Sequence, residues 1–247
     1  MPVFRKALSL HVPTLELDLQ LTQDHVFVVH HDAKLDPSRC VYDDGDKVER
    51  QAIDQLPYAA LSHVDCGRVV DPRFPEQQTV AATRIPRLQD VLALARAADY
   101  PVQLNVEIKW SERVSLTEAA YARQLLVLLE RYAMTQRTIV QSFHAPVLRA
   151  IGNLDPTVRR AMLVRQPEEY EIAVRQSGAT ILSPRYDRLQ RQDVERFQRL
   201  GIAVIPWTVN DPTDLCRMIA WGVNGLITDY PDRALWLVKN NGCKNVK

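Results

Sequence analysis

Short apolar runs alternate with longer segments of helical periodicity along most of the chain. This alternation is typical of parallel βα units, in which helices cover a sheet. The apolar runs predict strands at residues 14–19, 102–108, 138–141, 160–164, 179–182, 202–207 and 225–228. The helical pattern predicts helices at residues 3–10, 88–98, 116–132, 146–152, 168–176, 191–200 and 213–221. We therefore predict an α/β fold of the TIM-type (β/α)8 barrel class.

One further extended run, residues 26–30, follows the strand at 14–19 after a polar turn around Gln23 and Asp24. The connection is too short for a crossover helix, so we expect an antiparallel hairpin at the rim of the barrel. Without this hairpin, seven of the eight strands of a closed barrel are predicted. Because the sequence opens in a helix, the absent strand is expected to be the first.

Residues 33–86 interrupt the alternation. They contain several prolines and a polar DDGD turn, and they show little periodicity. We interpret them as an insertion or long loop within a single domain of residues 1–247, because we expect their apolar residues to be too few to form a core of their own.

Composition and net charge exclude some classes of binding partner and cellular location. The net charge of +1 predicts no broad attraction to nucleic acid or to an anionic membrane. No apolar stretch has the length of a membrane span or a signal peptide, so we expect no integral membrane segment and, as written, a cytoplasmic protein. A periplasmic or secreted location follows instead if the natural N-terminus lies upstream. The four cysteines form no CxxC pair, and we expect free thiols.

Polar side chains recur with strand periodicity on two predicted strands. Glu16 and Asp18 share one face of the first, and Asn105, Glu107 and Lys109 share one face of another. Carboxylates directed into a barrel require a compensating charge, and a divalent cation with oxygen ligands supplies it. Lys109 is suited to a phosphate oxygen. The alternative is that both stripes are only the polar faces of half-exposed or edge strands.

His30 and His31 end the rim hairpin. Adjacent strand residues point in opposite directions, so we expect at most one of them to face the site, where a histidine beside Asp32 would act as a general acid or base. Trp207 ends the predicted strand at 202–207 and would pack against an alcohol moiety or simply within the core. Asp229 would either bind a ligand or cap the next helix.

These residues, in this order, resemble the glycerophosphodiester phosphodiesterase family. The matching segments are FRKAL, TLELDLQLT, VFVVHHDAKLD, IPRLQDVL, NVEIK, VQSFHAPVLRAI, PWTVN and GLITDYPD, and they span nearly the whole chain.

The resemblance implies hydrolysis of small-molecule glycerophosphodiesters, such as glycerophosphocholine, to glycerol 3-phosphate and an alcohol. It implies a divalent cation, Mg²⁺ or Ca²⁺, held by Glu16, Asp18 and Glu107. It also implies that His31 is one of two histidines that transfer protons and that Lys109 contacts the phosphate.

The sequence departs from the family pattern at its beginning, because the family's His-Arg-Gly and Pro-Glu-Asn elements have no counterparts. Loss of one proton-transfer group is expected to lower the rate on the order of 100- to 10,000-fold. Three explanations are open: an upstream natural start, a truncated relative that binds phosphate esters without turnover, or a strand supplied by another chain. A lysophospholipid phosphodiesterase is a further alternative, but it would need an apolar entry to the site, and the polar residues 37–86 do not favour one.

Overall fold

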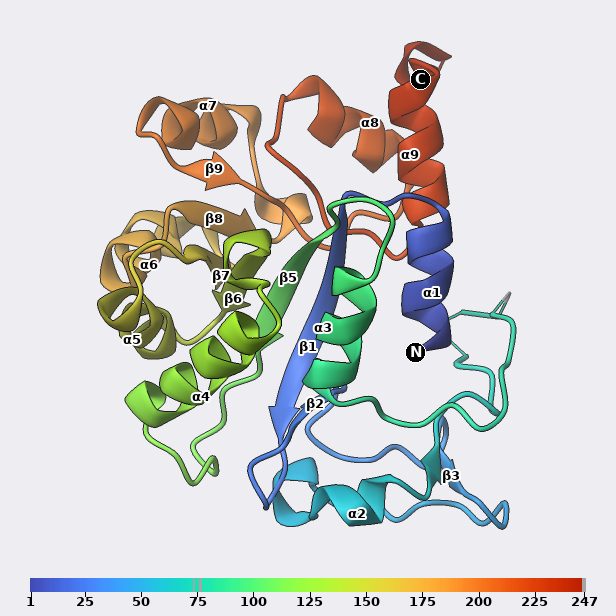
Figure 1. The fold of residues 1–247 in the computed structure, drawn as a ribbon. Helices are drawn as coiled ribbons and strands as arrows, with labels where there is room; N and C mark the ends of the chain where they lie inside the picture. The colour runs from blue at the N-terminus through green and yellow to red at the C-terminus, as the bar shows by residue number, and fades with distance from the viewer. Residues whose placement is uncertain (73, 76, 246–247) are drawn as a thin grey trace.

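The computed structural model describes residues 1–72, 74, 75 and 77–245, and its centre is one largely parallel sheet (Figure 1). Its strands lie in the order β2-β1-β5-β6-β7-β8-β9. Strand β2 runs antiparallel to β1, and the other neighbouring pairs are parallel. Helices lie around the outer side of this sheet, as the (β/α)-barrel class requires.

The elements agree with the predicted alternation. The strands of the sheet are β1 (Thr14–Leu21), β2 (Phe27–Val29), β5 (Gln103–Ile108), β6 (Thr138–Ser142), β7 (Arg159–Val164), β8 (Ile181–Pro184) and β9 (Ala203–Val204). The helices around it are α1 (Pro2–Ser9), α3 (Leu88–Arg96), α4 (Glu118–Arg131), α5 (Ala145–Leu154), α6 (Tyr170–Ser177), α7 (Arg191–Arg199), α8 (Pro212–Ala220) and α9 (Pro231–Lys239). Short 3₁₀ helices occupy Ile53–Gln55, Thr135–Arg137, Pro167–Glu169, Tyr186–Arg188 and Gly242–Asn245.

Side chains alternate between the two faces of β1 and β5, so the core residues and the polar residues of these strands lie on opposite faces of the sheet. Leu15, Leu17 and Leu19 of β1 are buried in the main hydrophobic core together with residues of the surrounding helices. On β5, Leu104 and Val106 are fully buried in the same core. The residues between them therefore direct their side chains to the opposite, inner face of the sheet.

Local sequence signals set the starts of several helices. Arg87 and Asp90 form a reciprocal capping interaction at the start of α3. Thr117 caps α4 by accepting a hydrogen bond from the backbone N–H of Ala120. Helix α8 begins with Pro212 directly after Asp211, whose carboxylate accepts a bond from the N–H of Thr213.

The last predicted strand, residues 225–228, is not a regular strand. Val209 donates its backbone N–H to Ile227 O at 2.8 Å, and Ile227 donates to Pro206 O at 2.9 Å. Residues 225–228 therefore lie beside the segment that follows β9. In the described part of the chain, no backbone hydrogen bond joins residues 225–228 to β1, so the ladder of β strands is not closed there.

The rim hairpin is confirmed, because β1 and β2 pair antiparallel with Leu19 opposite Val29 and Leu21 opposite Phe27. Thr22 stabilises the turn through its hydroxyl, which donates to Asp24 Oδ1 at 2.6 Å and accepts from the N–H of Val26.

The segment 33–86 has a hydrophobic core, and our expectation that it was too polar for one is wrong. It contains the two-stranded sheet of β3 (Val41–Tyr42) and β4 (Val64–Asp65) and the short helix α2 (Tyr58–Leu61). A second core cluster is formed by Val28, Leu35, Cys40, Val48, Ile53, Leu61, Val64 and Ile85. These apolar residues are too widely spaced in sequence to show a periodic pattern, and only the fold brings them together.

The prediction of free thiols is also wrong. The structure pairs Cys40 with Cys66 and Cys216 with Cys243, which uses all four cysteines. Val41 lies opposite Asp65 in the β3–β4 pair, so the two cysteines next to them face each other with a Cα–Cα distance of 4.1 Å. Their sequence separation of 26 residues carries no motif, and pairing becomes visible only when β3 meets β4.

None of the described helices is both long enough and apolar enough to cross a membrane.

One substitution tests how much β5 contributes to the stability of the core. Leu104→Ala should lower the free energy of unfolding by about 2–5 kcal/mol, because Leu104 is fully buried and the substitution leaves a cavity. Leu200→Ala is the matched control, since Leu200 is 62% exposed and the change should stay within about 0.5 kcal/mol. Urea unfolding of both variants measures this, and equal losses would contradict the assigned core.

Candidate active site

The parallel register of β1 and β5 brings the predicted acidic residues together. Glu16 lies opposite Asn105, and Asp18 lies opposite Glu107. Glu16, Asp18 and Glu107 each offer one carboxylate oxygen, and these three atoms lie within 4.8 Å of one another. The same-face arrangement that strand periodicity predicted for these residues is therefore present in the structure.

Lys109 forms ion pairs with two residues of this acidic cluster. Its Nζ lies 3.0 Å from Asp18 Oδ1 and 2.8 Å from Glu107 Oε1. Burial would lower the pKa of Lys109, but the charges of Asp18 and Glu107 outweigh burial and raise it. Lys109 therefore remains charged and compensates only part of the negative charge of the cluster.

The pKa of Glu16 is raised more strongly than the pKa of Glu107. Burial, followed by the charges of Asp18 and Glu107, raises the pKa of Glu16 well above its usual range. Burial also raises the pKa of Glu107, against the effect of Lys109. Gln141 Nε2 donates to Glu16 Oε1 at 2.8 Å, which orients the Glu16 carboxylate. In the absence of a further positive charge, the cluster favours partial protonation.

The donor set fits a hard divalent cation. The cluster contains three carboxylates, two of which pair with Lys109, and all their ligand atoms are oxygen. Asn105 donates its Nδ2 to Gln141 at 3.0 Å, while its buried Oδ1 has no hydrogen-bond partner among the described residues. A cation here would compensate for the missing partner of the Asn105 oxygen and would offset the excess negative charge of the three carboxylates.

Both histidines of the rim hairpin lie at this site, so the expectation that at most one would face it is not met. A cavity of about 290 Å³ is lined by Glu16, Asp18, His30 and His31, together with residues of α1 and of the segment 83–86. The alternation argument fails because His30 and His31 follow the last residue of β2 rather than lying within the strand.

His30 is held as a neutral imidazole. Its backbone N–H donates to Asp18 O at 3.0 Å, and its Nδ1 donates to the backbone O of Asp32 at 2.9 Å. Burial, with smaller contributions from Arg39 and His31, lowers the pKa of His30 to about 4. A histidine with this pKa is a poor proton donor at neutral pH.

His31 has a different environment. Its side chain is 61% exposed, and its Nδ1 lies 2.7 Å from Asp32 Oδ1. Since a carboxylate accepts from Nδ1, the Nε2 of His31 carries the lone pair and is left to exchange protons with a ligand. The role of His31 in proton transfer stays a prediction, and its contact with Asp32 and its exposure are compatible with that role.

The side chain of Trp207 contacts Ser183 and Phe143. Its Nε1 donates to Ser183 O at 2.8 Å, and its ring packs edge-on against Phe143 with centroids 5.5 Å apart. None of the contacts observed for Trp207 in the described part of the chain reaches Glu16, Asp18 or Glu107. Its predicted role as a ligand contact stays a prediction.

The role of Asp229 was left undecided by the sequence. Tyr230, not Asp229, precedes α9 as its N-cap residue. Asn210 Nδ2 donates to Asp229 Oδ2 at 2.8 Å, and the charge of Asp229 contributes to the raised pKa of Glu16. The sequence feature that could have indicated Asp229 is its position directly after a strand-like run in the last βα unit, because barrel enzymes place their sites at the carboxyl ends of strands.

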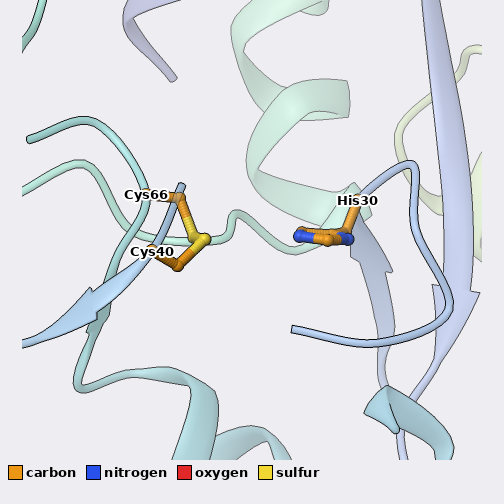
Figure 2. A group of neighbouring side chains, drawn as sticks. All are labelled: His30, Cys40 and Cys66. Atoms are coloured by element: carbon orange, nitrogen blue, oxygen red, sulfur yellow. A yellow bond between two sulfur atoms is a disulfide. The ribbon is translucent and has the colours of Figure 1, made fainter. Parts of the chain in front are cut away.

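Two cysteines also come close to the site (Figure 2). His30, Cys40 and Cys66 each offer one atom of ligand type, and these atoms lie within 4.8 Å of one another. The two sulfur atoms are bonded to each other as a disulfide, so this group does not form a metal site in the observed state.

The glycerophosphoryl diester phosphodiesterase family model matches residues 1–233. The chain belongs to this family. Glycerophosphoryl diester phosphodiesterases are phosphoric diester hydrolases that generally depend on a divalent cation, in keeping with the acidic cluster of β1 and β5.

Known members of the family align over nearly the whole chain. A glycerophosphodiester phosphodiesterase of Caldanaerobacter subterraneus subsp. tengcongensis is 30% identical over 241 residues, which are 97% of this chain and 91% of that protein. The crystal structure of a putative glycerophosphoryl diester phosphodiesterase from Silicibacter pomeroyi has a TM-score of 0.90 and 27% identity, and covers 98% of this chain and 88% of that one.

A third relative carries a ligand. The phosphodiesterase of Oleispira antarctica, solved in complex with the product sn-glycerol-3-phosphate, has a TM-score of 0.79 and 21% identity, over 96% of this chain and 90% of that chain. At this identity the comparison shows the shared fold.

The environment of His30 predicts a pH dependence of stability. Its folded pKa of about 4 lies below its ordinary value of 6.5, so its contribution to stability is present above pH 6.5 and is lost as the pH falls toward 4. The contribution is on the order of 3 kcal/mol. Urea unfolding between pH 7.5 and 4 should show a shallower pH dependence for His30→Gln than for the wild type. His63→Gln, at a 73% exposed side chain, is the control, and identical slopes for wild type and His30→Gln would refute the assignment.

Proposed function

We propose that this chain hydrolyses glycerophosphodiesters to sn-glycerol 3-phosphate and an alcohol, with a divalent cation held by Glu16, Asp18 and Glu107. The observation that carries the proposal is the cluster of three carboxylate oxygens within 4.8 Å of one another on the inner face of β1 and β5, next to Lys109. The product complex of the Oleispira antarctica protein, on the same fold, supports this substrate class.

The proposed roles follow from the contacts. When bound, the cation supplies charge neutralisation and lowers the pKa of a reacting oxygen. Lys109 pairs with Asp18 and Glu107 and offers its remaining hydrogen-bonding capacity to a phosphate oxygen. Gln141 keeps the Glu16 carboxylate in place.

Proton transfer is assigned to His31. Asp32 accepts the hydrogen of Nδ1, so Nε2 is available to take a proton from an attacking oxygen or to return one to the leaving alcohol. The exposure of His31 gives a substrate access to this nitrogen. Trp207 is assigned a packing contact with the glycerol or alcohol moiety.

The metal and the compartment are also proposals. Oxygen ligands of this kind suit Mg²⁺ or Ca²⁺. Two disulfides that use all four cysteines favour an oxidising compartment, such as the periplasm or the exterior, over the cytoplasm.

The direct test is release of glycerol 3-phosphate from glycerophosphocholine by the purified chain. We expect release that requires Mg²⁺ or Ca²⁺, stops on chelation and falls by at least about 100-fold in His31→Gln, the usual effect of removing a proton-transfer group. His63→Gln should retain full activity. Cation binding without any release of glycerol 3-phosphate would reject hydrolysis and favour a binding protein for phosphate esters.

The cation site has a readout that is independent of turnover. A cation at 100 times its dissociation constant should stabilise the fold by about 2.7 kcal/mol. Because the pKa of Glu16 is raised, protons compete with the cation, and the stabilisation should be larger at pH 8 than at pH 5. Asp18→Asn should abolish the effect, whereas Glu195→Gln, on the exposed face of α7, should not. Equal stabilisation of Asp18→Asn and wild type by the cation would exclude this site.

A further inference from the structure

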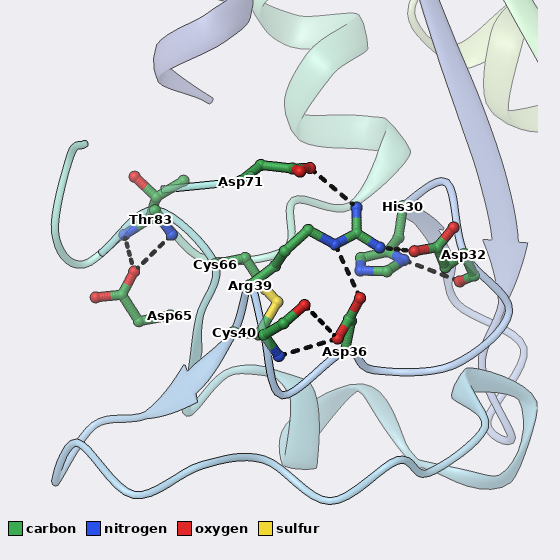
Figure 3. The surroundings of a disulfide bond; sticks show 11 residues. His30, Asp32, Asp36, Arg39, Cys40, Asp65, Cys66, Asp71 and Thr83 are labelled. Carbon is green, nitrogen blue, oxygen red and sulfur yellow. Dashed lines mark hydrogen bonds and ion pairs between the residues drawn. A yellow bond between two sulfur atoms is a disulfide. The ribbon is translucent and has the colours of Figure 1, made fainter. Parts of the chain in front are cut away.

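Arg39 binds the carboxylate that accepts a hydrogen bond from His31. Figure 3 shows Arg39 with its acidic neighbours Asp32, Asp36 and Asp71. The Arg39 guanidinium forms an ion pair with Asp32, the same carboxylate that accepts from His31 Nδ1. It also lies 3.2 Å from Asp36 Oδ2 and 3.6 Å from Asp71 Oδ2. With only 20% of its side chain exposed, Arg39 binds three carboxylates in a partly desolvated position, where charge-assisted contacts are stronger than at the surface.

A disulfide sits directly beside this arginine. Arg39 precedes Cys40, which is 2% exposed and bonded to Cys66. The other end of the link is firmly held, because the buried carboxylate of Asp65 accepts backbone N–H bonds from Gly67, Ala82 and Thr83. The backbone N–H of Cys66 in turn donates to Thr83 O at 2.9 Å.

These contacts form a continuous series from the disulfide to the site. Hydrogen bonds to the backbone around Asp65 hold Cys66 in place, and the disulfide bond connects Cys66 to Cys40. Arg39, next to Cys40 in the sequence, pairs with Asp32, and Asp32 accepts the hydrogen bond from His31. The turn at Asp36 supports the same stretch, since its backbone O accepts from the N–H groups of Arg39 and Cys40. The disulfide covalently links Cys40, next to this turn, to Cys66, which lies 26 residues further on and directly follows Asp65.

We propose that Arg39 is a positioning residue for His31 and that the Cys40–Cys66 disulfide holds it in place, so that the oxidation state of this disulfide sets the rate of the reaction. This proposal rests on the role assigned to His31 under the proposed function. Breaking the disulfide frees the Arg39 segment from its tie, the guanidinium leaves Asp32 for part of the time, and His31 loses its fixed tautomer.

The chemical step is thiol–disulfide exchange with a dithiol. One thiolate of the reductant attacks the sulfur of Cys66 and displaces Cys40 as a thiolate, and the second thiolate then closes a disulfide in the reductant and releases Cys66. Two electrons and two protons end on the cysteines, and the dithiol is oxidised to a disulfide. Cys66 lines the cavity that His30 and His31 also line, which gives a small dithiol a path to its sulfur.

The second disulfide provides a matched control. Cys216 and Cys243 join α8 to the C-terminal 3₁₀ helix, and neither residue belongs to the site. Dithiothreitol treatment of the folded wild type and of Cys216→Ser/Cys243→Ser should lower kcat about tenfold or more in both, with a smaller change in KM. Cys40→Ser/Cys66→Ser should start at the reduced rate and should not respond to the dithiol. Reoxidation should restore the wild type.

Substitution of Arg39 separates its guanidinium from the crosslink. Arg39→Gln in the oxidised protein keeps the disulfide and should lower kcat by a similar factor, and reduction should then cause little additional loss, because the two changes interrupt one series of contacts. Arg39→Lys keeps the charge but not the planar fork, and should recover part of the rate. Thermal unfolding of each variant shows that the assays are made on folded protein.

Imidazole ¹⁵N NMR gives a readout that does not need turnover. The oxidised wild type should show His31 as the Nδ1–H tautomer, and both reduction and Arg39→Gln should convert it to a mixture of tautomers. An unchanged His31 tautomer, or a loss of rate on reduction that persists in Cys40→Ser/Cys66→Ser, would overturn the proposal. If the oxidised wild type releases no glycerol 3-phosphate, the proposed function fails, and the tautomer measurement alone decides whether the disulfide orients His31.

Discussion

The parallel pairing of β1 with β5 is the constraint on which the site depends. It sets Glu16 beside Asn105 and Asp18 beside Glu107 while Leu15, Leu17 and Leu19 enter the main core. Because side chains alternate along a strand, a shift of one residue would turn three leucines inward and move the carboxylates into the helical layer. Burial of the leucines therefore excludes a one-residue slip and keeps the carboxylates on the inner face of the sheet.

This register has an electrostatic cost that the core must offset. Burial, and after it the repulsion between neighbouring carboxylates, hinders ionisation in this group, as the raised pKa values of Glu16 and Glu107 show. A sheet selected only for stability would place apolar or neutral residues at these positions. The arrangement is reasonable for a site that gains its missing positive charge from a bound cation, and family membership supplies the chemical context for that cation.

Strand periodicity was enough to predict the acidic cluster, because Glu16 with Asp18 and Glu107 with Lys109 are each related by local spacing. The same argument could not choose between His30 and His31, since both lie beyond the regular part of β2 and line one cavity. The motif resemblance favoured His31, and its contact with Asp32 gives that choice a physical basis, although the role itself stays a prediction.

Features that depend on distant segments could not be predicted in this way. The Cys40–Cys66 disulfide, the second core and the ion pair of Arg39 with Asp32 arise when β3 meets β4 and the inserted segment folds back on the hairpin. Asp229 reaches the electrostatic neighbourhood of Glu16 across more than two hundred residues of sequence. Such contacts leave no periodic signal, because each partner satisfies only its own local pattern.

Strand β2 has a consequence for how this protein can change over evolution. Its alternation sends Phe27 into the main core and Val28 into the core of the inserted segment. The two cores share this strand, and the histidine pair follows it directly. The inserted segment can therefore diverge in length and composition without rebuilding the barrel, as long as position 28 presents an apolar side chain. Variation in the segment would then alter the surroundings of His31 while the residues of β1 and β5 stay unchanged.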